Sequence, residues 1–231
     1  MARGYRFARH LRGVPPGEAI SAERGRLERY FDAHTTGPGI WKWRHYFDIY
    51  ERHLSKFVGQ EVHVVEVGIY SGGSLPMWRE YLGSGSRIYG VDIEPACRTY
   101  ADEGIEVFIG DQADDAFWAR FREAVPHVDV VIDDGGHELH QQIATLECLL
   151  PHIRFGGVYI CEDINHVLNP FHSYIDGLGR PLNRTRLGAT ALHQHVASVH
   201  RYPQVAVIEK PDQPIAAFDD PRRGTEWQPF W

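Results

Sequence analysis

The sequence predicts an α/β fold, in which a mostly parallel sheet has helices on both faces and an antiparallel hairpin at its C-terminal end. Three observations predict it. Short β-rich runs alternate with helical stretches, and this order requires crossover connections between parallel strands. Two late β-rich runs are separated by residues 210–214 alone, too few for a crossover. The chain has 231 residues, enough for one well-buried core and short for two.

The first strongly periodic element is a helix that we expect to begin near Ile40. Its apolar residues recur at steps of three and four, which places them on one helix face: Ile40, Trp43, Phe47, Tyr50, Leu54 and Phe57. Five parallel strands are expected at His63–Gly68, Arg87–Ile93, Val107–Gly110, Val128–Asp133 and Val158–Cys161. Helices are expected at Ser74–Tyr81, Asp114–Val125, His137–Leu150 and Leu187–His200. The closing hairpin is expected from Gln204–Glu209 and Ile215–Phe218.

Proline- and glycine-rich segments in the N-terminal part of the chain predict its domain organisation. We expect residues 1–39 to form an N-terminal arm and residues 40–231 to form one domain. Within that domain, about 164–186 form a long connection rich in Pro, Gly, Asn and His, and such loops are commonly lids or binding loops. The aromatic C-terminal residues Trp227, Phe230 and Trp231 would form a patch that seeks a partner surface, so we expect a homodimer or larger homo-oligomer.

Charge and composition exclude several partners. The net charge of −7 disfavours a nucleic-acid partner, which would require a concentrated basic surface. No run of about 18 apolar residues occurs, and the N-terminus has no apolar stretch of the secretory type. The three cysteines form neither a CxxC pair nor a disulfide framework. We therefore expect a cytoplasmic protein without a membrane or nucleic-acid partner, acting on a small molecule.

A glycine-rich turn follows the first predicted strand, in the run HVVEVGIYSGGS of residues 63–74. Gly68, Gly72 and Gly73 permit positive φ and a close approach of the backbone to a ligand, and the helix that follows offers free amides. Asp92 ends the next strand, where a carboxylate can accept hydrogen bonds from both hydroxyls of a ribose. The two features together favour a nucleotide-like cofactor over a plain strand-to-helix turn.

The third strand ends in Gly110, Asp111 and Gln112, at the sheet edge where open α/β sheets bind ligands. The polar side chains there are candidates for the far end of the same cofactor. Asp111 is equally consistent with capping the helix that follows.

Four acids are predicted to gather at the sheet edge, because two neighbouring strands end in Asp133–Asp134 and in Glu162–Asp163. Their mutual repulsion needs a cation or protons to offset it. Carboxylates with no thiol nearby suit Mg²⁺, which can lower the pKa of a bound hydroxyl. His137 is the candidate base for that hydroxyl. The alternatives are that the aspartates only cap a helix, that His137 has no chemical role, or that His137 and His140 bind zinc.

Five segments carry a resemblance to a known family, namely EVGIYSGGS, YGVDI, GDQADDAFW, VDVVIDDGGH and GGVYICEDI. Their order resembles that of the metal-dependent sugar O-methyltransferases of the macrolide and rhamnosyl type, over roughly Ile40 to Asp163. The resemblance implies the Rossmann-like sheet of class I methyltransferases, with S-adenosylmethionine and Mg²⁺ as cofactors. It departs from many methyltransferases at Tyr70, where they carry glycine.

The resemblance also implies roles for individual residues. Glu66, Gly68, Ser71 and Gly72 would hold the methionine end of S-adenosylmethionine, Asp92 the ribose, and Asp111 with Gln112 the adenine side, with Asp133 placed among the cofactor contacts. Asp134, Glu162 and Asp163 match the metal ligands, and His137 matches the catalytic base.

The expected substrate is a sugar hydroxyl. The larger macrolide-sugar enzymes carry an extra N-terminal domain for which 231 residues leave no room, so we expect a free or glycosidic mono- or oligosaccharide at least as readily as a macrolide. Trp41, Trp43 and Tyr46 are candidates for a pocket wall, although aromatic residues at helical spacing usually belong to the core. A catechol-type methyltransferase, an NAD-dependent oxidoreductase and a silent cofactor-binding module are the rival interpretations.

Overall fold

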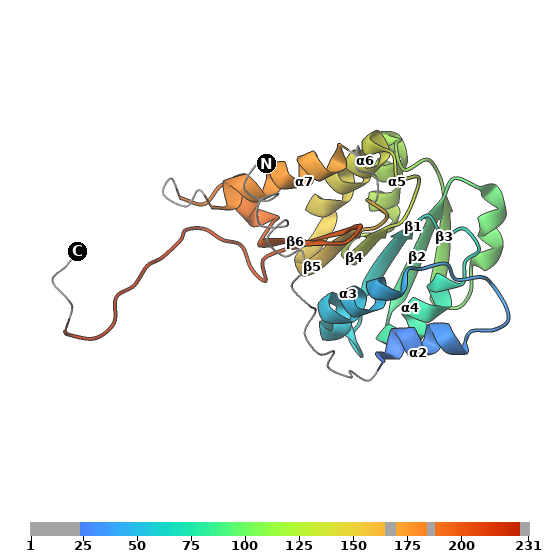
Figure 1. The fold of residues 1–231 in the computed structure, drawn as a ribbon. Coiled ribbons are helices and arrows are strands. Elements are labelled where there is room, and N and C mark those ends of the chain that lie inside the picture. The colour runs from blue at the N-terminus through green and yellow to red at the C-terminus, as the bar shows by residue number, and fades with distance from the viewer. Residues whose placement is uncertain (1–23, 165–169, 184–187, 227–231) are drawn as a thin grey trace, which may run out of the picture.

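A computed structural model gives the structure of the chain and describes residues 24–164, 170–183 and 188–226. Its centre is a seven-stranded sheet of order β3-β2-β1-β4-β5-β7-β6 (Figure 1). Strands β1 to β5 pair in parallel, and β7 is antiparallel to both β5 and β6. The strands are β1 (His63–Val67), β2 (Arg87–Asp92), β3 (Ile105–Ile109), β4 (Val128–Asp133), β5 (Ile153–Cys161), β6 (Ser198–Tyr202) and β7 (Val205–Glu209).

Helices cover both faces of the sheet (Figure 1). They are α2 (Arg26–Ala33), α3 (Arg44–Leu54), α4 (Ser74–Leu82), α5 (Asp115–Ala124), α6 (Leu139–Leu149) and α7 (Phe171–Leu182). Because successive side chains of a strand point to opposite faces, Val64 joins the core under α2, α3 and α4, and Val65 joins the core under α5, α6 and α7. The mostly parallel sheet with helices on both faces is therefore confirmed.

The five predicted parallel strands are present, with small differences at their ends. β3 begins two residues earlier than predicted, and β5 extends back to Ile153. The helices predicted near Ser74, Asp114 and His137 are present as α4, α5 and α6. The helix predicted from Ile40 begins at Arg44 and continues after Leu54 as a 3₁₀ turn at Ser55–Phe57.

The strand predicted at Gln204–Glu209 is confirmed as β7, but its hairpin partner, predicted at Ile215–Phe218, was predicted wrongly. The strands of the hairpin are β6 and β7, which pair from Ser198↔Glu209 to Tyr202↔Val205, and residues 215–218 form no strand. The helix predicted at 187–200 is also wrong, because the described part of that range holds only a 3₁₀ turn at Ala191–Gln194 and the start of β6. Residues 198–202 form a strand through their pairing with β7, and Gln204 turns the chain at a φ of 65°.

Two segments predicted as irregular contain helices. Helix α7 occupies much of the predicted loop at about 164–186, with Phe171 and Ile175 buried against the core. Helix α2 lies inside the predicted arm, and its Leu27 is completely buried. The aromatic patch at Trp227, Phe230 and Trp231 falls outside the described residues. Among the residues that the structure describes, no helix is long and apolar enough to cross a membrane.

Candidate functional site

A cavity of about 790 Å³ opens at the carboxyl edge of the parallel strands. This is the edge at which parallel α/β sheets bind ligands. Most of the residues that the sequence singled out line it: Gly68, Ser71, Asp92, Asp111, Gln112, Asp134, His137, Glu162 and Asp163. Glu66, Gly72 and Asp133 do not line the cavity and support it from behind.

The glycine-rich turn after β1 forms one wall of the cavity. Gly68 has a φ of 82°, and a Cβ atom there would overlap the backbone oxygen of Asp134. Gly72 has a φ of 74°, and a Cβ atom would overlap the ring of Tyr100. Both positions therefore require glycine on two counts, backbone conformation and space. Gly68 lets the turn pass close to the loop after β4, and Gly72 lets it pass close to Tyr100.

Tyr70 occupies a position in this turn where glycine is the easier residue. Its φ is 46°, in the left-handed region that is unfavourable for side chains with a Cβ atom. A residue with a side chain at this position therefore carries a conformational cost. The Tyr70 amide donates a hydrogen bond of 3.0 Å to Asp92 Oδ2, which ties the turn to the end of β2.

Asp92 is held in place by two backbone amides. Oδ2 accepts from Tyr70 and Oδ1 accepts from the Glu94 amide at 2.9 Å. Its carboxylate lies on the cavity lining. Each carboxylate oxygen has a further acceptor site, so Asp92 can accept hydrogen bonds from a ligand with two neighbouring hydroxyls.

Gln112 and Asp133 are buried and hydrogen-bonded to each other under the loop that follows β4. Gln112 donates to Asp133 Oδ1 at 3.1 Å and accepts from the Gly136 amide at 2.7 Å. Asp133 Oδ2 accepts from Tyr159 at 2.7 Å, and burial raises the pKa of Asp133 to about 7. These partners enclose Asp133, which does not line the cavity. Its hydrogen bond to Gln112 orients that side chain and, through it, the loop. Asp111 accepts from the Ala113 amide, as a residue that caps the next turn does.

Lys42 lies among three acids, of which Asp134 and Glu162 were predicted to converge and Glu66 was not. Its Nζ atom is 2.7 Å from Asp134 Oδ2, 3.0 Å from Glu162 Oε2 and 3.2 Å from Glu66 Oε1, and the side chain is almost completely buried. Burial opposes its charge, but the surrounding carboxylates outweigh burial and raise the pKa of Lys42 well above its usual value. The acids therefore share a cation that belongs to the protein itself.

Glu162 is completely buried and uses both of its oxygens within the protein. Tyr50 donates to Oε1 at 2.7 Å, and Lys42 donates to Oε2 at 3.0 Å. Burial raises the pKa of Glu162 to about 8, although Lys42 lowers it. Glu66, also buried, accepts a 2.6 Å hydrogen bond from Ser74 on its other oxygen. These two glutamates form the floor that supports Lys42.

Asp134, His137 and Asp163 form the exposed side of the same site. Each offers one ligand atom, and these atoms all lie within 4.8 Å of one another. The His137 Nε2 atom is 3.9 Å from Asp163 Oδ2. Tyr46 donates to Asp163 Oδ1 at 2.6 Å. His137 and Asp163 have φ values of 59° and 50°, and such strained conformations concentrate at functional sites.

This group fits a hard divalent cation. Asp134 and Asp163 present carboxylate oxygens, the ligands that Mg²⁺ prefers, and no thiol is among the three side chains. Nδ1 of His137 is buried and has no hydrogen-bond partner among the described residues, so Nε2 is the nitrogen that can exchange a proton. His140, the second histidine of the zinc alternative, is exposed and outside the group.

Sequence reasoning missed Lys42 and the role of two tyrosines. Tyr50 was assigned only to the apolar face of its helix, and Tyr46 only to a pocket wall. The available signal was the position of this lysine, between two tryptophans and directly before an amphipathic helix. A charged side chain that is buried among apolar residues needs an opposite charge as its partner. Trp41 and Trp43 do line the cavity, with 85% and 52% of their surfaces exposed.

The sheet order and the antiparallel β7 define the class I methyltransferase fold. Residues 65–164 match a family model described as a methyltransferase domain. The chain is 30% identical over 199 residues to 8-demethyl-8-alpha-L-rhamnosyl tetracenomycin-C 2'-O-methyltransferase of Streptomyces olivaceus, a match that covers 75% of this chain and 52% of that protein. It is 35% identical over 210 residues to L-olivosyl-oleandolide 3-O-methyltransferase of Streptomyces antibioticus, covering 82% and 52%.

A solved structure shows the same fold. The MycE methyltransferase of the mycinamycin biosynthetic pathway, in complex with Mg, SAH and mycinamycin VI, superposes with a TM-score of 0.68 and 25% identity, covering 80% of this chain and 52% of that one. The chain thus spans about half the length of the relatives it matches. The chain therefore belongs to this methyltransferase family, and residues 65–164, which match the domain model, include strands β4 and β5.

Proposed function

We propose that the protein transfers a methyl group from S-adenosylmethionine to a sugar hydroxyl, with a divalent cation bound by Asp134, Glu162 and Asp163 and with His137 as the general base. The observation that carries the proposal is the grouping of Asp134, His137 and Asp163 within 4.8 Å beside the cavity that the glycine-rich turn and Asp92 line. One cavity thus combines a place for the methyl donor with a place for a hydroxyl.

The methyl donor would lie along the edge from β1 to β3. Asp92 would accept the ribose hydroxyls, and the turn at Gly68, Ser71 and Gly72 would receive the methionine end, with Glu66 behind it. Asp111 and Gln112 would face the adenine side. Asp133 would act through its hydrogen bond to Gln112 and would not touch the cofactor.

On the acceptor side, a bound divalent cation supplies positive charge that lowers the pKa of a hydroxyl. His137 would take the hydroxyl proton on Nε2, and Asp163 would stabilise the resulting imidazolium from 3.9 Å. Asp134 and Asp163 would be the ligands with accessible oxygens. Glu162 would contribute from the floor, where Lys42 and Tyr50 already occupy one side of each oxygen.

The exposed rings of Trp41 and Trp43 suit a sugar acceptor. Both line the cavity, and flat aromatic surfaces stack against the apolar faces of sugar rings. The named relatives act on sugars attached to macrolide or tetracenomycin cores. We propose the same class of acceptor, a small-molecule sugar or glycoside, for a cytoplasmic enzyme that acts as a homodimer or larger homo-oligomer.

The test is label transfer from methyl-labelled S-adenosylmethionine to a panel of monosaccharides, oligosaccharides and glycosides, with catechol as a non-sugar acceptor. Transfer to a sugar hydroxyl is expected, to be lost with a chelator and restored by Mg²⁺. The His137→Ala variant should lose about 100- to 10,000-fold in rate, the range for a general base. Preferential labelling of catechol would refute the sugar assignment, and full activity of both His137→Ala and Asp134→Asn would refute the mechanism.

A further inference from the structure

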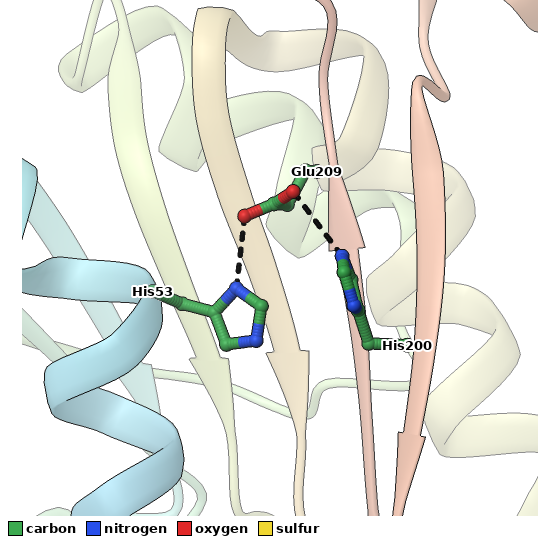
Figure 2. A group of neighbouring side chains, drawn as sticks. All are labelled: His53, His200 and Glu209. Atoms are coloured by element: carbon green, nitrogen blue, oxygen red, sulfur yellow. Dashed lines mark hydrogen bonds and ion pairs between the residues drawn. The ribbon is translucent and has the colours of Figure 1, made fainter.

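A second group of metal-binding side chains lies between α3 and the β6–β7 hairpin (Figure 2). His53 comes from α3, His200 from β6 and Glu209 from β7. His53 Nδ1 is 2.8 Å from Glu209 Oε1, and His200 Nε2 is 3.2 Å from Glu209 Oε2. One ligand atom from each residue lies within 4.8 Å of the other two.

Two imidazoles and one carboxylate are a ligand set that zinc favours, with water in the fourth position. Zinc bonds of about 2.0 to 2.2 Å to nitrogen and oxygen would place tetrahedral ligand atoms about 3.3 Å apart. The separations of 2.8 and 3.2 Å end on the two different oxygens of Glu209, and one ligand atom from each residue lies within 4.8 Å of the other two. Side-chain adjustments of up to about 1.5 Å would therefore bring three ligand atoms to the tetrahedral spacing.

Further hydrogen bonds orient two of the three ligands, His53 and Glu209. Tyr202 places its hydroxyl 2.9 Å from His53 Nε2, the nitrogen that faces away from Glu209. Ser198 donates to Glu209 Oε2 at 2.9 Å. A metal-binding histidine commonly donates its second N–H to such a partner, which fixes both tautomer and ring orientation. The group has these outer partners in place.

The group can be reached from solvent, although His53 is buried. His200 and Glu209 are partly exposed, which leaves an entry path for an ion and a position for water.

We propose that His53, His200 and Glu209 bind a zinc ion that fastens α3 to the β6–β7 hairpin. One face of α3 carries Tyr46, Tyr50 and His53, which contact Asp163, Glu162 and Glu209 respectively. The ion would hold the helix that presents both tyrosines to the acids of the candidate active site. Its role is structural, since the group does not line the cavity.

The test is calorimetric titration of the full chain with Zn²⁺ after removal of metals, in excess Mg²⁺. The wild type is expected to bind one zinc ion that His200→Ala lacks, in addition to any zinc that replaces Mg²⁺ at the cavity acids of both proteins. The His200→Ala variant should weaken that binding by more than about 100-fold, beyond the usual effect of changing an outer partner. Zinc should raise the thermal midpoint of the wild type more than that of His200→Ala.

His45→Ala is the matched control, because His45 lies on the same helix but bonds only the Pro203 oxygen and stands outside the group. It should bind zinc as the wild type does. Circular dichroism without metal checks that each variant is folded. If the wild type binds no zinc in the presence of Mg²⁺, or if His200→Ala binds it with wild-type affinity, the proposal is overturned.

Discussion

Lys42 Nζ lies 2.7 Å from Asp134 Oδ2, so a residue before the first strand of the sheet neutralises an acid at the end of β4. The same ammonium group contacts Glu162, at the end of β5. The acids of the candidate active site are therefore kept together by a buried ion-pair network in addition to any metal. The network also fixes the segment that carries Trp41 and Trp43 over the cavity.

Removal of Lys42 should strongly destabilise the protein. In Lys42→Met, three carboxylates lose their shared partner, and breaking a buried ion pair costs about 3 to 5 kcal/mol. The free energy of unfolding, measured with a chemical denaturant, should fall by about that amount. Lys56→Met is the control, because Lys56 is exposed and only approaches the Phe57 ring, so its loss should cost less than about 1 kcal/mol. An equal decrease in the free energy of unfolding in the two variants would contradict the claim that the ion-pair network around Lys42 stabilises the protein.

Asp92 should be required for cofactor affinity. Its carboxylate is fixed by the amides of Tyr70 and Glu94 and faces the cavity, so Asp92→Asn removes a charged acceptor from the ribose. Hydrogen bonds to charged groups contribute about 1.5 to 3 kcal/mol, which corresponds to roughly a 10- to 100-fold weaker Kd for S-adenosylhomocysteine. Glu94→Gln, at a neighbouring acid of the cavity, should change Kd by less than about 3-fold. Calorimetry gives both values, and an unchanged Kd for Asp92→Asn would refute the ribose assignment.

Gly68 should tolerate no side chain. Gly68→Ala adds a Cβ atom at positive φ that also overlaps the Asp134 backbone oxygen, and it should displace the β4 loop together with the site. Gly59→Ala is a matched control, since Gly59 has a φ of 75° with nothing within 4 Å of the added atom. The free energy of unfolding of Gly59→Ala should fall only by the conformational cost of about 1 to 2 kcal/mol. A thermal or denaturant midpoint equal in the two variants would show that the close approach of turn and loop is unimportant.

His63, which begins β1 and lies away from the acids of the candidate site, should make the free energy of unfolding depend on pH. Burial, followed by His127, lowers the pKa of His63, and its Nδ1 lies 3.0 Å from the Tyr89 hydroxyl, within hydrogen-bond distance. A lowered folded-state pKa means that the contribution to stability is complete above the unfolded value of about 6.5 and is lost as pH falls below it.

The unfolding free energy of the wild type should therefore fall below pH 6.5, with His63 contributing a slope of at most about 1.4 kcal/mol per pH unit. In His63→Asn this part of the slope should disappear. Denaturant unfolding between pH 5 and 8 measures both proteins. Parallel curves for the two would contradict the assignment.

Much of the fold could be predicted from local pattern. The buried runs of β1 and β4 and the glycine-rich turn at Gly68 have strong signals in short windows of sequence. The first strand of the closing hairpin could not be placed, because residues 198–202 mix histidine and arginine into a strand that becomes evident only when it pairs with β7. Helix α7 was missed because glycine and proline in residues 171–182 disfavour a helix locally, whereas Phe171 and Ile175 pack against the core.

The candidate site was predictable where residues follow strand ends, since sheet topology brings those ends together. Asp134, Glu162 and Asp163 do meet at one edge. What could not be predicted is the division of tasks among them. Glu162 is buried against Tyr50 and Lys42, whereas Asp163 faces His137, and this difference depends on how α3 packs on the sheet.

The most direct test of the central claim is Mg²⁺ binding by the full chain in saturating S-adenosylhomocysteine, measured by calorimetry. We predict one Mg²⁺ ion per chain in the wild type, at least about 10-fold weaker binding in Asp134→Asn and in Asp163→Asn, and wild-type binding in Asp111→Asn, which changes an acid of the same cavity outside the cluster. Equal Mg²⁺ affinity in all four proteins, or no Mg²⁺ binding by the wild type, would contradict a metal site at Asp134 and Asp163.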